Sequence, residues 1–88
     1  MKCVHMHVFG KVQGVFFRAN VKAKAEELGL NGYAKNLADG SVEVVAQGQN
    51  EHLDELVSFI RKNPGIAQVK DIKINHKETE DFKEFKVM

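Results

Sequence analysis

The sequence is poor in residues that would link a small chain covalently or anchor it in a membrane. Cys3 is the only cysteine among 88 residues, so an internal disulfide and a disulfide-stapled secreted domain are excluded. We interpret Cys3 as a small buried hydrophobe. No apolar run approaches the roughly 20 residues that a membrane-spanning helix needs. The first residues follow a strand-like pattern rather than that of a cleavable signal peptide. We therefore expect a cytoplasmic protein without a membrane partner.

The sequence also has no large excess of either charge. Thirteen basic and twelve acidic side chains give a net charge of +1. Nonspecific binding to nucleic acid would need several Lys or Arg side chains clustered on phosphates, so we expect no nucleic-acid partner. The length predicts one domain, residues 1–88, with a two-layer core. Nothing in the sequence requires more than a monomer.

The sequence does contain segments with the hydrophobic spacing of strands and segments with that of helices, which follow one another along the chain. Residues 1–9, 41–47 and 69–74 show the period of two that is typical of strands, with a possible bulge between Val69 and Ile72. Residues 19–28 follow a helical pattern that ends at Gly29, and the helical spacing already begins at Phe17. A second helix is predicted from Asn50, as its N-cap, to Lys62. Residues 31–38 and 41–47 flank the turn dipeptide Asp39-Gly40 as a hairpin, and residues 82–87 suggest a short final strand.

This element order predicts the fold class. A β-α-β-β-α-β sequence is the ferredoxin-like arrangement of the α+β class, an antiparallel sheet with two helices on one face. The short C-terminal strand adds to it. In this topology we expect the loop after the first strand to approach the start of the second strand.

The stretch Gly10–Arg18 is the strongest candidate for a functional site. It is a glycine-containing loop between a predicted strand and a helix, where backbone N–H groups and the helix N-terminus can hold an anion such as phosphate. The guanidinium of Arg18 would add a planar fork of donors. The stretch lacks both the Walker A ending and the G-x-G-x-x-G spacing. The residues by themselves are also compatible with an ordinary loop that binds no anion. In that case Arg18 would be solvated, or it would form a surface ion pair with Glu26 or Glu43.

Two motifs in the chain resemble the signatures of the acylphosphatase family. Residues 10–18, Gly-Lys-Val-Gln-Gly-Val-Phe-Phe-Arg, match its G-x-V-Q-G-V-x-F/Y-R signature. Residues 32–36, Gly-Tyr-Ala-Lys-Asn, followed by Gly40, Val42 and Gly48, match its second signature. The length and element order also match, so the resemblance covers essentially the whole chain.

The resemblance implies hydrolysis of small acyl phosphates to a carboxylate and inorganic phosphate, without metal or organic cofactor. Arg18 matches the phosphate-binding arginine and Asn36 the water-orienting asparagine. The phosphate, or another oxyanion, would be held by residues of the loop: Gln13, Gly14, Val15, Phe16, Phe17 and Arg18. A carboxylate leaving group has a conjugate acid with a pKa of about 4, so a site without a general acid can suffice.

Three other interpretations of the same residues are kept for comparison. Asn36 precedes a turn, where asparagine often bonds to its own backbone. A noncatalytic module of this fold could bind a phosphorylated small molecule or an RNA end, but aromatic side chains on the open sheet face and the RNP1 pattern are not evident. His5 and His7 share a strand face, but further zinc ligands are not found at a recognisable spacing.

Overall fold

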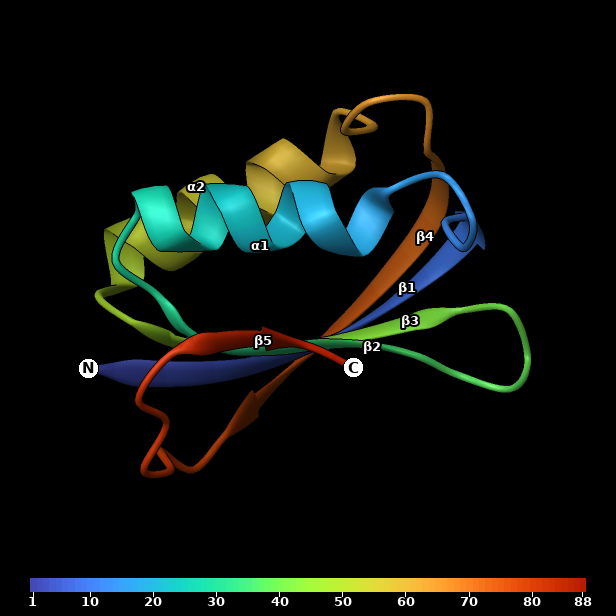
Figure 1. Ribbon diagram of the computed structural model, residues 1–88. Coiled ribbons are helices and arrows are strands. Elements are labelled where there is room, and N and C mark those ends of the chain that lie inside the picture. The colour runs from blue at the N-terminus through green and yellow to red at the C-terminus, as the bar shows by residue number, and fades with distance from the viewer.

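The computed structural model describes residues 1–88, which form five strands and two helices (Figure 1). The element order confirms the predicted ferredoxin-like fold with a short additional strand. In chain order the elements are β1 (Lys2–Lys11), α1 (Phe17–Glu27), β2 (Asn31–Asn36), β3 (Val42–Gly48), α2 (Asn50–Arg61), β4 (Gln68–Lys77) and β5 (Phe85–Val87).

The strands form one sheet in the order β4-β1-β3-β2-β5. The first four strands pair antiparallel, as expected, but β5 pairs with β2 in parallel, so the sheet is mixed rather than antiparallel. The direction of β5 follows from the segment 78–84, which crosses from the β4 edge to the β2 edge on the face away from the helices (Figure 1). After that crossing the chain turns back and runs alongside β2.

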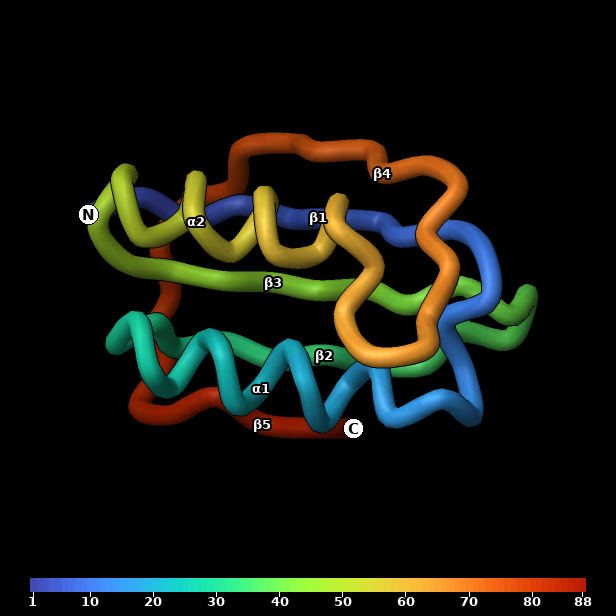
Figure 2. The backbone as a smooth tube through the Cα atoms, turned by 90° about the horizontal axis from the view of Figure 1, so that it is seen from above, coloured from blue at the N-terminus to red at the C-terminus, as the bar shows by residue number.

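Both helices cover one face of the sheet, and the core lies between the two layers. Figure 2 shows α1 above β2 and β5, and α2 above β1 and β3. The alternation of β1 places Val4, Met6 and Val8 in this core. Phe17 and Leu56 contribute from α1 and α2, and both are almost completely buried. Neither helix is long and apolar enough to cross a membrane.

One of the two predicted helix starts was wrong. The helix α1 begins at Phe17, where the helical spacing of the sequence begins, and the buried Phe17 already faces the sheet in its first turn. Asn50 is not the N-cap of α2 but its first residue. The capping position is occupied by Gln49, which is extended and whose backbone oxygen accepts from the N–H groups of His52 and Leu53. The predicted stop at Gly29 is confirmed by its positive φ of 72°.

The predicted bulge in the last long strand lies next to the candidate loop. Phe9 pairs with Asp71 and Gly10 pairs with Val69, so Lys70 is left without a partner on β1. Gly10 has a φ of 130°, and a Cβ at this position would lie 2.1 Å from the backbone oxygen of Gln68. Only glycine therefore allows β1 to pass β4 so closely as it enters the loop.

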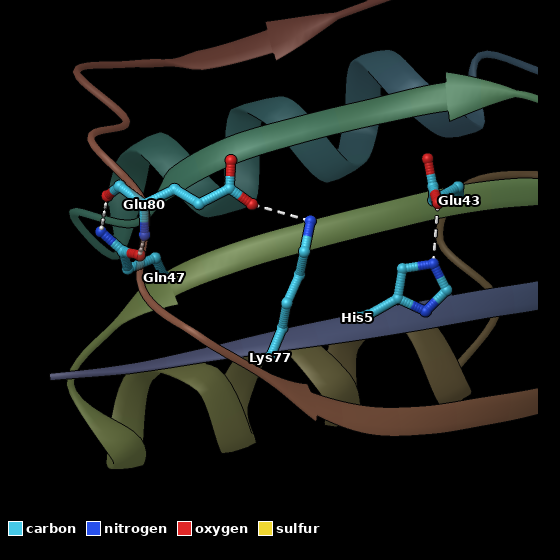
Figure 3. A network of polar contacts seen from close by, with 5 residues as sticks. All are labelled: His5, Glu43, Gln47, Lys77 and Glu80. Carbon is cyan, nitrogen blue, oxygen red and sulfur yellow. Dashed lines mark hydrogen bonds and ion pairs between the residues drawn. The ribbon is translucent and has the colours of Figure 1, made fainter.

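The sheet face away from the helices is partly covered by the segment 78–84. Gln47 exchanges two hydrogen bonds of 2.8 Å with the backbone of Glu80, and Lys77 pairs with the Glu80 carboxylate at 2.7 Å (Figure 3). The ring of Phe82 packs edge-on against Tyr33. Contrary to the sequence-based expectation, aromatic side chains do occur on this face. Tyr33 and Phe9 are two of them, and both are half-buried rather than exposed.

Candidate active site

The loop between β1 and α1 is built around two buried valines. Val12 and Val15 are 1% and 6% exposed and anchor residues 12–16 to the core. Between and after them the backbone turns through positive φ, 72° at Gly14 and 60° at Phe16. No hydrogen bond within the chain uses the backbone N–H of any residue from 13 to 18 as its donor. The loop therefore presents a run of free donors, which is the property of an anion-binding site.

Arg18 lies in the first turn of α1 and is half-buried. Its Nη1 donates a hydrogen bond of 2.6 Å to the backbone oxygen of Met88. The two carboxylates considered as alternative partners are engaged elsewhere, Glu26 with Lys22 at 3.7 Å and Glu43 with His5 at 2.8 Å. Arg18 is thus fixed at the loop by its contact with Met88 rather than by either of these carboxylates.

Asn36 is the last residue of β2, not part of its start, so the predicted approach of the loop to the start of the second strand was wrong. The end of β2 lies level with the end of β1 because both strands run antiparallel to β3, where Val42 pairs with Val8 and with Asn36. The backbone N–H of Asn36 donates to the same Met88 oxygen as Arg18, at 3.4 Å. The two candidate residues therefore meet at one backbone atom.

The side chain of Asn36 is free to bind something outside the chain. Its Oδ1 is buried and has no hydrogen-bond partner, which is costly unless a ligand or water is bound there. The alternative interpretation, a side chain bonded to its own backbone, is not observed. The unpaired amide oxygen of Asn36 is an acceptor, and the free N–H groups of the loop are donors, so the two segments joined at Met88 offer both.

The side chain of Gln13 joins the loop to the hairpin that follows Asn36. Its Nε2 donates to the backbone oxygens of Leu37, at 2.8 Å, and Ser41, at 2.9 Å. This amide therefore bonds to the hairpin, and only the backbone N–H of Gln13 remains available to a phosphate. Neither this contact nor the contribution of Met88 was predicted, because both join segments far apart in the sequence.

The hairpin is further fixed by polar contacts from β1. His7 Nε2 lies 2.6 Å from Ser41 Oγ, and both the hydroxyl and the backbone N–H of Ser41 donate to Asp39. These two hydrogen bonds lower the pKa of Asp39. His5 and His7 thus contact Glu43 and Ser41 respectively, and no group of three or more His, Cys, Asp or Glu side chains is placed to hold a metal ion.

A pocket of about 270 Å³ opens at the loop. Arg18 is the only charged residue that lines it, and the other six are Val12, Gly14, Phe16, Phe17, Ala19 and Val87. A larger pocket of about 470 Å³ lies beside the segment 78–84, but its charged lining residues are two acidic and two basic side chains. Four residues of the loop that carries the free N–H donors, Gly14, Phe16, Phe17 and Arg18, line the smaller pocket, which is therefore the candidate active site. Asn36 does not line it but is joined to Arg18 through the Met88 oxygen.

The fold and this site define a class of protein, a ferredoxin-like α+β protein with a loop of unpaired backbone N–H groups between its first strand and first helix. The chain belongs to the acylphosphatase family, whose model matches residues 4–87. The sequence-based identification of the family is therefore confirmed.

Individual members of the family match over almost their full length. An acylphosphatase of Methylococcus capsulatus is 45% identical and is aligned over 100% of this chain and 97% of its own. The crystal structure of acylphosphatase from Bacillus subtilis superposes with a TM-score of 0.96 at 31% identity, covering 100% of this chain and 99% of that one. The structure of an acylphosphatase from Coxiella burnetii gives a TM-score of 0.94 at 42% identity, covering 99% and 92%.

Proposed function

We propose that the chain hydrolyses the carboxyl–phosphate bond of small acyl phosphates, with the phosphate held by the loop 13–18 and water oriented by Asn36. The observation that carries this proposal is the run of backbone N–H groups, from Gln13 to Arg18, that donate to nothing else in the chain. Family membership supplies the reaction, and these donors supply a place for the phosphate.

The phosphoryl oxygens would accept hydrogen bonds from the loop and from Arg18. A guanidinium has five N–H donors, and the contact with Met88 uses one of them, so the others remain for the substrate. Gly14 allows the backbone to curl around the anion, because its φ of 72° is unfavourable for other residues and no atom lies within 4 Å of where a Cβ would be. Charge-assisted bonds of this kind are stronger than neutral ones.

The amide oxygen of Asn36 would accept a hydrogen bond from the attacking water and so orient its lone pair toward phosphorus. As the water oxygen bonds to phosphorus, the bond from phosphorus to the acyl oxygen breaks and its electron pair leaves on the carboxylate. The two protons of the water stay on the phosphate, which is released as dihydrogen phosphate. The carboxylate needs no proton at neutral pH, so positioning and charge stabilisation carry the catalysis. No step of this scheme uses a metal or an organic cofactor.

The site is formed by residues of one chain, so we propose that a monomer is sufficient for activity. A buried free thiol at Cys3, whose pKa is raised by burial, suits a reducing compartment such as the cytoplasm.

The test compares the parent protein with the variants Arg18→Gln and Arg61→Gln on benzoyl phosphate. Arg61 is an exposed arginine at the end of α2 and serves as the matched control. We expect the parent and Arg61→Gln to hydrolyse the substrate and to be inhibited by inorganic phosphate. Arg18→Gln should weaken that inhibition by about ten- to a hundredfold, since one charge-assisted hydrogen bond contributes about 1.5–3 kcal/mol.

Two outcomes would contradict the proposal in different ways. A parent protein that is stabilised by phosphate but hydrolyses no acyl phosphate would instead be a binding module of the same fold. Equal inhibition of Arg18→Gln and the parent would show that Arg18 does not bind the phosphate.

A further inference from the structure

Phe16 combines two unusual properties at the mouth of the candidate active site. It is 79% exposed, more than any other large hydrophobic side chain of the chain. It also adopts a φ of 60°, and only Asn63 shares a positive φ among the residues other than glycine. A bulky side chain rarely adopts this backbone region, and such strain gathers at functional sites.

The burial of the neighbouring residues shows that Phe16 is not a packing residue. Val15 and Phe17, on either side of it, are buried in the core, at 6% and 1% exposed. The left-handed turn at Phe16 lets both neighbours point inward and leaves its own ring outside. The ring therefore lies against solvent at the pocket, where an apolar ligand would remove it from water.

The pocket that Phe16 lines is apolar beyond Arg18. Val12 and Phe17 are nearly inaccessible, so the apolar surface offered to a ligand comes from Phe16, from Val87, which is 41% exposed, and from the small side chain of the exposed Ala19. No acidic side chain and no second basic side chain lines the pocket. An acyl group that carries its own charge would find no partner there.

We infer that Phe16 is a specificity-determining residue and that the preferred substrates are acyl phosphates with an uncharged, apolar acyl group, aromatic or branched rather than small. This inference rests on the proposed function, because the phosphate must sit on the loop for its acyl group to reach the ring. The phosphate group of every substrate would bind to the loop in the same way, so substrates would be distinguished by the contact of their acyl group with the apolar side chains of the pocket, of which Phe16 is the largest exposed one.

The experiment measures kcat/KM for benzoyl phosphate and for acetyl phosphate and takes their ratio. The variant is Phe16→Asn, because asparagine tolerates a positive φ and its side chain is polar. The control is Ile74→Asn, which replaces a 38% exposed apolar residue on β4 that does not line the pocket. The inhibition constant of inorganic phosphate is measured for each protein as a check on the loop.

We expect Phe16→Asn to lower the ratio about tenfold or more, the scale on which apolar contacts in a pocket separate substrates. Ile74→Asn should keep both the parent ratio and the parent inhibition by phosphate. Phe16→Leu should retain part of the preference, because it keeps an apolar side chain at the same place.

Two results would overturn the inference. The first is an unchanged ratio in Phe16→Asn, including the case in which both substrates slow equally, which would mean that Phe16 only shapes the loop. A parent protein that prefers acetyl phosphate would also contradict it. A parent that hydrolyses neither substrate would instead contradict the proposed function, so the two failures are distinguishable.

Discussion

Asn36 contributes to the site an amide oxygen that the folded chain leaves without a partner. The side chain is held at the end of β2 by a backbone contact to Met88, so its position does not depend on its own amide group. A buried oxygen of this kind is expected to bind water, and water is the nucleophile of the proposed reaction.

Replacing Asn36 by alanine should separate catalysis from binding. We expect Asn36→Ala to lower kcat on benzoyl phosphate by about a hundredfold, the typical cost of losing one oriented polar group in an active site. Inhibition by inorganic phosphate should be nearly unchanged, because Arg18 and the loop remain. Asn75→Ala, at an exposed position of β4, is the control. Turnover of Asn36→Ala at the parent rate would exclude a role in orienting water.

At the scale of elements, the site depends on the contact between the loop and the β2–β3 hairpin. The amide of Gln13 bonds to the backbone oxygens of Leu37 and Ser41, so it joins the loop 13–18 to the hairpin that follows Asn36. This side chain therefore helps to hold the loop and the hairpin in their relative position, together with the contacts of Ser41 and Met88 described above.

The variant Gln13→Leu tests this connection. It removes both hydrogen bonds and leaves two backbone oxygens with one fewer donor, so we expect the free energy of unfolding to fall by about 1–2 kcal/mol. Activity should fall as well, because Asn36 is less firmly placed. Urea denaturation and benzoyl phosphate hydrolysis provide the two measurements. Gln49→Leu is the control, since Gln49 is exposed and its side chain makes no capping bond. If Gln13→Leu has the same free energy of unfolding and the same activity as the parent, Gln13 does not position the hairpin relative to the loop.

Local patterns in the sequence predicted most of the elements, and the exceptions have physical reasons. The end of α1 at Gly29 and the row of buried side chains along α1 depend on rules that act within a few residues, and both were predicted correctly. The start of α2 was misplaced because Asn50 is a favourable N-cap residue, whereas the chain leaves β3 in an extended conformation through Gln49. The parallel pairing of β5 depends on where the segment 78–84 crosses the sheet, which no local rule determines.

The candidate site was predictable in its residues but not in its arrangement. The family motifs pointed to Arg18 and Asn36, and the structure brings both to one backbone oxygen. The partner that joins them, Met88, lies outside both motifs. Because the contact is made by a backbone atom, the identity of its side chain carries no signal in the sequence.

At the scale of the whole molecule, the sheet face opposite the site contributes to pH-dependent stability. Burial raises the pKa of Glu43, but hydrogen bonds from His5 and Tyr33 lower it more, so its folded-state pKa lies below the ordinary value (Figure 3 shows the His5 contact). A carboxyl group with a lowered pKa stabilises the fold above its ordinary pKa of about 4.3, and this contribution is lost as the pH falls through the lowered value.

The variant Glu43→Gln should therefore be less stable than the parent near pH 6, by at most about 1 kcal/mol for a partly exposed pair. The difference between the two should shrink as the pH is lowered below about 4.3. Thermal unfolding across this range gives the measurement. Glu78→Gln, at an exposed position, should show no such trend. A difference that is constant with pH would contradict the assigned direction of the Glu43 pKa shift.

The hydrogen bond from Arg18 to Met88 closes a loop of chain with a sequence separation of 70 residues. Contacts this distant form late in folding, because the entropy of closing the intervening chain must first be overcome. The loop 13–18 can fold locally, but Arg18 is fixed only after β5 has docked beside β2. Recovery of enzymatic activity during refolding should therefore lag behind the recovery of helical signal, and activity reports on completion of the sheet.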